Sequence, residues 1–175
     1  MRVIGLDPGL QRTGWGVIEW RSNRLRHIDH GVVTSDASRD LAERLRQLHE
    51  ALAGVLAEQE PDEAAIEVTL ANRNPTASLK LGMARGVALL APALLGLPVA
   101  EYQPTTIKQA VVGTGRATKD QVAMMVARLL PGCAVTSADA ADALAVAICH
   151  AHTSASRRRW DPAAAGVRGG KVAAR

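Results

Sequence analysis

Two apolar segments of this chain end in a carboxylate, and that pattern limits the folds open to it. The first segment is followed by Asp7 and the second by Glu67, while Asp139 and Asp142 lie three residues apart in an alanine-rich segment typical of helix. A carboxylate at the last residue of a buried strand is costly unless something neutralises it. Oxygen ligands suit Mg²⁺ or Mn²⁺ better than zinc or copper. The four acids therefore indicate a divalent-metal site that acts on phosphate.

Strand-like patterns dominate the first third of the chain. Segments 2–7, 14–20 and 25–34 are separated by Gly, Pro or polar clusters, as expected of a β-meander. Two later strands are predicted at 63–67 and 98–102. Three consecutive strands followed by alternating helices and strands predict an α/β domain, with a mixed five-stranded sheet flanked by helices.

Helical periodicity begins after the meander. Leucines recur at three- and four-residue steps over 39–58, which predicts an amphipathic helix. Further helices are predicted at 75–95, 104–111, 118–130 and 137–152. The last of these carries the acidic pair on one face, because residues three apart are neighbours on a helix surface.

The helix predicted at 75–95 is too apolar for an isolated surface helix. Gly82 and Gly86 lie one turn apart within it and would let another helix approach closely. Burial in the core is the simpler interpretation. The sharper interpretation is that one face packs against the same helix of a second copy, which would give a two-fold dimer with two paired sites.

Composition and charge fit one folded domain. The chain has 175 residues, of which 47% are hydrophobic. Six of its 21 basic residues lie in residues 154–175, so we predict a folded domain over 1–153 and a basic, disordered tail over 154–175. We expect no membrane span, because no run of about 18 apolar residues is evident. No signal peptide is evident either, because the chain starts directly with a strand.

Cysteine and histidine usage gives little indication of a second metal site. Cys133 and Cys149 have no metal-ligand spacing, and the simplest interpretation is a reduced, cytoplasmic protein. The five histidines show no spacing tied to the acids, so we interpret them as structural.

Five segments, in order along the chain, resemble the RuvC family of Holliday-junction resolvases. Each segment alone is a weak signal, but five in register from residue 1 to about residue 152 are highly specific. The segments are Ile-Gly-Leu-Asp-Pro-Gly at 4–9, Ile-Glu at 66–67, Leu-Lys-Leu-Gly-Met-Ala-Arg-Gly-Val at 79–87, Val-Val-Gly-Thr-Gly at 111–115 and Ala-Asp-Ala-Ala-Asp-Ala-Leu-Ala at 138–145.

This resemblance implies a fold and an activity. The implied fold is RNase H-like, and the implied protein is a homodimer that would resolve four-way DNA junctions by paired, symmetric, metal-dependent nicks during homologous recombination and DNA repair. The implied cofactor is Mg²⁺ or Mn²⁺, with two ions in each active site. A branch-migration helicase complex is the implied partner.

Residue by residue, the resemblance also implies a catalytic set. Its metal-binding acids are Asp7, Glu67, Asp139 and Asp142. Its basic residues near the cleaved phosphate are Lys108 and Lys119, on either side of a glycine-containing loop.

A second group of residues is expected to contact DNA. The family often has an aromatic residue where this chain has Leu70, which could still wedge apolar bulk between bases. The candidate phosphate contacts are Arg73, Lys80, Arg85 and Arg116, each with a solvated surface role as the alternative.

Three other functions stay open on the sequence. Asp7-Pro8-Gly9 followed by Thr13-Gly14 also resembles the phosphate loop of sugar-kinase and actin-like ATPases, although those proteins need two such lobes. A non-catalytic junction-binding module is the second alternative. A general RNase H-like nuclease that cuts hybrids or flaps is the third.

Overall fold

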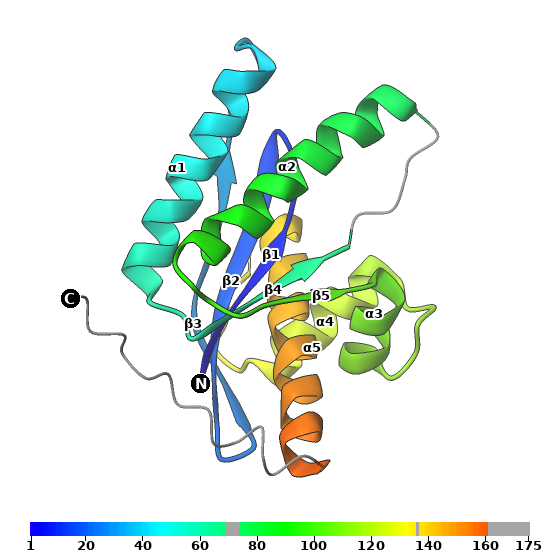
Figure 1. Cartoon of the computed structure of the whole chain (residues 1–175). Helices are drawn as coiled ribbons and strands as arrows, with labels where there is room; N and C mark the ends of the chain where they lie inside the picture. Colours follow the sequence, from blue (N-terminus) through cyan, green and yellow to red (C-terminus); the bar gives the residue numbers. More distant parts are fainter. Residues whose placement is uncertain (69–73, 136, 161–175) are drawn as a thin grey trace, which may run out of the picture.

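A mixed five-stranded sheet forms the centre of the protein (Figure 1). The computed structural model describes residues 1–68, 74–135 and 137–160. Its strand order is β3-β2-β1-β4-β5. Strand β2 pairs antiparallel with both β1 and β3, whereas β4 pairs parallel with both β1 and β5. The strands are β1 (Arg2–Asp7), β2 (Arg12–Arg21), β3 (Arg24–Thr34), β4 (Glu63–Glu67) and β5 (Val99–Tyr102). The predicted mixed sheet is confirmed.

Five helices flank this sheet in the described part of the chain. They are α1 (Leu41–Gln59), α2 (Pro75–Leu94), α3 (Pro104–Val112), α4 (Lys119–Leu129) and α5 (Ala138–Trp160). All five lie where the periodicity predicts them. The one clear difference is that α5 ends at Trp160 rather than near residue 152. Alanine and arginine, both strong helix formers, continue the helix into the segment that we predicted as tail.

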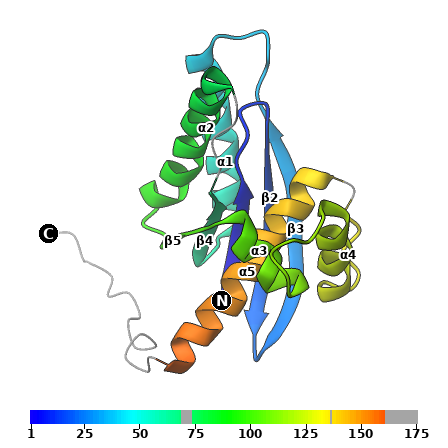
Figure 2. The same ribbon diagram turned by 90° about the vertical axis from the view of Figure 1, so that its right-hand side faces the viewer.

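The helices cover the two faces of the sheet unequally. Figure 2 shows α1 and α2 on one face and α5, with α3 and α4 beyond it, on the other. Each central strand supplies apolar side chains to the core on both faces of the sheet, because successive side chains point to opposite faces. Thus Ile4 packs in the cluster with α1, whereas its neighbour Val3 packs in the cluster with α5.

Glycines on β1 and β2 let α5 lie directly on the strands. Gly5 and Gly16 are cross-strand partners, as are Asp7 and Gly14. A Cβ atom on Gly5 would overlap the carbonyl oxygen of Ala143 and lie 2.6 Å from the backbone nitrogen of Ala147. A Cβ atom on Gly14 would likewise overlap the carbonyl oxygen of Asp139 in α5. The helix backbone therefore approaches as closely as the strand backbone allows.

Helix α2 is buried on one side and apolar on the other. Ala84, Ala88 and Ala91 are buried in the cluster with α1. The opposite side, here called the α2 outer face, consists of Leu79, Gly82, Met83, Gly86, Leu90 and Leu94, which are all exposed. A Cβ atom on either glycine would meet nothing within 4 Å.

By length and composition alone, α2 would also pass for a membrane span. Its mean hydropathy reaches 1.2, and 22% of that window is buried. Lys80 and Arg85 interrupt this segment, so it is not a continuous apolar run, although its average composition is apolar. Packed helices of globular domains pass the same test, and α2 packs on α1, so this finding is weak support for a span.

We predict that Gly5→Ala destabilises the fold by about 2 kcal/mol or more, because overpacking a tight contact forces backbone shifts. The matched control is Gly54→Ala on α1, where the added methyl group meets nothing within 4 Å. That change should instead stabilise the protein by up to about 1 kcal/mol, since alanine is the better helix former. Urea unfolding measures both effects. Equal stability of the two variants would contradict the close α5 contact.

Candidate active site

The acids at the strand ends meet at one edge of the sheet. β1 and β4 are parallel neighbours in which Leu6 pairs with Ile66, so Asp7 and Glu67 follow side by side. Gly14, the cross-strand partner of Asp7, is in contact with the backbone of Asp139. The structure therefore brings three separate elements, and the acids predicted on them, to one place.

Clustering of these acids disturbs their ionisation. Burial raises the pKa of Asp7 to about 7, and the neighbouring Glu67, Asp142 and Asp139 add to the rise while Lys119 opposes it. Burial and then Asp142 also raise the pKa of Glu67. Raised pKa values are the expected result of like charges in a desolvated site.

Two cations are paired with the acids of α5. The Lys119 ammonium lies 2.7 Å from Oδ2 of Asp142, and this bond raises the pKa of Lys119. The Arg12 guanidinium lies 2.6 Å from Oδ2 of Asp139 and donates a second, 3.4 Å bond to Oγ of Ser137. Arg12 was not among the predicted site residues, because its partner Asp139 is far away along the chain and no local motif marks the pair.

A cavity of about 270 Å³ opens beside Asp7. Its polar lining comes from Asp7, Glu67, Asp142, Lys108 and Lys119. Its apolar wall comes from Val68, Pro104, Ile107, Val122 and Ala145. The charge of Lys108, on α3, partly opposes the rise in the pKa of Glu67 that burial causes. Both predicted lysines thus lie at the same cavity as three of the predicted acids.

The donor set of this site fits a hard divalent cation. All four acids offer oxygen only, and the raised pKa of Asp7 shows that its negative charge is poorly compensated. Within the described ranges, the four acids do not gather three ligand oxygens within 4.8 Å of one another. Ion pairs with Arg12 and Lys119 hold the two α5 acids instead, so a bound cation would compete with these cations for the acids.

The predicted DNA contacts lie in several places. Lys80 on α2 and Arg116 on the α3–α4 loop are exposed. Leu70 and Arg73 lie outside the described residues. Arg85 is half-buried and forms an ion pair with Glu101 of β5, which joins α2 to β5. Contact of Arg85 with DNA stays a prediction.

This combination of sheet and acids defines a class of protein. A mixed sheet with carboxylates at the ends of two adjacent parallel strands, completed by acids on a crossing helix, is the arrangement of an RNase H-like nuclease. The model of the family described as crossover junction endodeoxyribonuclease RuvC matches residues 3–150. The chain belongs to this family.

Individual relatives agree with that assignment. The crossover junction endodeoxyribonuclease RuvC of Paramagnetospirillum magneticum is 61% identical over 91% of this chain and 96% of its own length. The protein of the same name from Granulibacter bethesdensis is 63% identical over 91% of this chain and 90% of its own. Among solved structures, Thermus thermophilus RuvC in complex with a Holliday junction substrate superposes with a TM-score of 0.81 at 34% identity, covering 88% and 94% of the two chains.

We predict that Asp7→Asn stabilises the metal-free protein at neutral pH. The pKa of Asp7 rises from 3.8 to about 7 on folding, so its ionised form destabilises the folded state. Wild type therefore loses stability as the pH rises from about 4 to about 7, and the variant should lose less, because only Glu67 keeps a raised pKa in it. In chelator at pH 8 the variant should melt about 5 °C higher than wild type, and the gap should close near pH 4.

Glu58→Gln on α1 is the matched control, because Glu58 is an exposed carboxylate outside the cluster. Its melting temperature should follow that of wild type across the pH range. A constant difference between Asp7→Asn and wild type at pH 4 and pH 8 would contradict the charge cluster.

Proposed function

We propose that this protein is a structure-selective endodeoxyribonuclease that resolves Holliday junctions by paired, symmetric nicks during homologous recombination and DNA repair. The observation that carries this proposal is the acidic cavity at the ends of β1 and β4, in a chain that belongs to the crossover junction endodeoxyribonuclease RuvC family. Thermus thermophilus RuvC, a relative of the same fold, has been solved in complex with a Holliday junction substrate, which supports the same substrate class here.

The nucleases of this family depend on divalent metal ions, and we assign two Mg²⁺ or Mn²⁺ ions to each active site of this chain. Asp7, Glu67, Asp139 and Asp142 would hold them, with Asp7 most central because all three other acids act on its pKa. When bound, such ions activate water and stabilise charge on the phosphate and on the departing oxygen.

The side chains around these acids have distinct roles in the proposal. Lys119 is 78% exposed, so its ammonium can turn from Asp142 toward a phosphate that enters the cavity. Lys108, which lines the same cavity, would hold the DNA backbone. Arg12 would orient Asp139 through their charge-assisted hydrogen bond of 2.6 Å.

A homodimer is part of the proposed function. The α2 outer face exposes large apolar side chains, with Leu79 62%, Leu90 51% and Leu94 65% exposed. Contiguous apolar surface on a globular domain marks an interaction site. Gly82 and Gly86 leave room for the backbone of a second helix at the middle of this face. Two-fold pairing through α2 would give each junction two active sites.

Further assignments follow the same proposal. Lys80 and Arg116, both exposed, would contact the DNA backbone, as would Arg73, while Leu70 would wedge between bases; Leu70 and Arg73 lie outside the described residues. We place the protein in the cytoplasm, where both cysteines stay reduced. A branch-migration helicase complex is the proposed partner at the junction.

We predict that the protein nicks a four-way junction with Mg²⁺ or Mn²⁺ and leaves linear duplex and RNA–DNA hybrid of the same sequence largely uncut. Asp7→Asn should cut the junction about 1,000-fold more slowly, which corresponds to about 4 kcal/mol of lost transition-state stabilisation. Gel analysis of junctions labelled on each strand measures both rate and symmetry.

Melting curves in the same buffers separate loss of metal from loss of fold. Metal should raise the melting temperature of wild type and raise that of Asp7→Asn less. Equal cutting of all three substrates would remove the junction assignment. ATP hydrolysis without DNA would favour the kinase-like alternative instead, and junction binding without any cleavage in Mn²⁺ would favour a binding module.

We predict that Leu90→Glu separates the proposed dimer. Burying an unpaired charge at an apolar interface costs about 3–5 kcal/mol, so the dissociation constant should rise at least about 100-fold. Met124→Glu on α4 is the matched control, because Met124 is 63% exposed and lies outside α2. Light scattering after size exclusion measures the mass. A Leu90→Glu variant that keeps the wild-type mass would contradict the α2 interface.

A further inference from the structure

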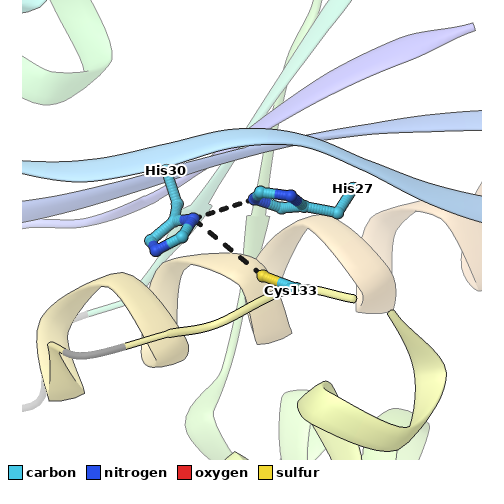
Figure 3. A group of neighbouring side chains, drawn as sticks. All are labelled: His27, His30 and Cys133. Carbon is cyan, nitrogen blue, oxygen red and sulfur yellow. Dashed lines mark hydrogen bonds between the residues drawn. The ribbon is translucent and has the colours of Figure 1, made fainter. Parts of the chain in front are cut away.

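Two histidines and a cysteine meet on the sheet, away from the acidic cavity (Figure 3). Nε2 of His27 lies 2.8 Å from Nδ1 of His30, and Sγ of Cys133 lies 3.9 Å from the same Nδ1 atom. All three potential ligand atoms lie within 4.8 Å of one another. None of the three residues lines the cavity beside Asp7.

A β-bulge brings the two histidines to one face of the sheet. Residues three apart on a regular strand point to opposite faces. Between β2 and β3 the register shifts, so that Val17 pairs with Asp29 while the next residue, Ile18, pairs with His27. The extra residue on β3, Ile28, packs in the cluster with α1. His27 and His30 therefore share the α5 side of the sheet, and a bulge is a feature that often re-aims a side chain.

Cys133 approaches the histidines from the segment that follows α4. A tight turn positions it, in which Gly132 has a φ of +85° and the Cys133 backbone nitrogen bonds the Leu130 carbonyl at 3.1 Å. The thiol is free and half-buried against the α5 core. Cys133 and His30, which are in contact, lie 103 positions apart in the sequence.

The ligand set matches a borderline or soft metal rather than Mg²⁺. Imidazole and thiolate are the usual zinc ligands, whereas Mg²⁺ and Mn²⁺ prefer oxygen. Ligand atoms on a tetrahedral zinc ion lie about 3.3–3.6 Å apart, from bond lengths of about 2.0–2.3 Å. The observed 2.8 Å and 3.9 Å separations bracket that range. Small side-chain movements would thus suffice to seat the ion.

We propose that His27, His30 and Cys133 form a Zn²⁺ site, with water as the fourth ligand, that is separate from the catalytic metal centre. The bound ion would cross-link β3 to the turn after α4, because its ligands come from both segments. From that turn the chain leads within a few residues to α5, which begins at Ala138 and carries Asp139 and Asp142. The site would therefore steady the start of the helix that delivers two catalytic acids.

Cobalt substitution tests this site in the full-length protein. Co²⁺ added to metal-free protein should produce the near-ultraviolet charge-transfer band of a thiolate ligand, which carboxylates do not give. Zn²⁺ should displace the cobalt with a stoichiometry of one ion per chain. Cys133→Ala should abolish the band and weaken Zn²⁺ binding about 100-fold or more, and His30→Gln should weaken it similarly.

Two variants serve as matched controls. Cys149→Ala removes the other cysteine, which is buried in α5, and His49→Gln removes a histidine of α1. Both should keep the band and the affinity of wild type. Absence of a thiolate band in wild type, or a band that persists in Cys133→Ala, would overturn the proposal. So would loss of the band in Cys149→Ala alone. Junction cleavage in Mg²⁺ is a separate readout, so failure of this site leaves the nuclease assignment intact.

Discussion

Direct packing of α5 on β1 and β2 governs both the core and the acidic site of this protein. It is permitted because the strands carry Gly5 and Gly14 where the helix backbone crosses, and the helix carries small residues such as Ala143 and Ala147 at the same places. A larger side chain on either surface would push the helix away from the sheet. Because Asp139 itself touches Gly14, the same contact that closes the core also sets the acids of α5 beside Asp7.

That arrangement concentrates negative charge and therefore opposes stability. The raised pKa of Asp7 records the conflict, since burial and three neighbouring carboxylates all disfavour its ionised form. Arg12 and Lys119 offset part of the cost by pairing with the acids of α5. Uncompensated negative charge of this kind fits the divalent-metal dependence of the RuvC family, and it illustrates how function is built at the expense of stability.

The two faces of the sheet serve different purposes in our account. The α5 face holds the chemistry, together with the cavity lined by Lys108 and Lys119. The other face carries α1 and α2, and its outermost surface is the apolar α2 outer face proposed for dimerisation. On β3, at the edge of the sheet, the His27–His30–Cys133 group would tie the meander to the segment that leads into α5. Association is thus assigned to one face of the sheet, whereas catalysis and the proposed zinc site lie at different places on the other face.

Local patterns along the chain were enough to predict the elements and the fold class, because strand alternation, helical periodicity and strand-end acids can each be seen in a short segment. The family was predicted from a resemblance carried by five segments in order along the chain. Asp7 and Glu67 were predictable for the same reason, since an acid that ends an apolar strand is visible within a few residues. Contacts between distant residues emerged only in the folded chain, such as Arg12 with Asp139, 127 positions apart, or Arg85 with Glu101. The bulge that turns His27 toward His30 emerged there as well. Register, bulges and long-range ion pairs depend on how whole elements pack, and no local pattern in this chain encodes that packing.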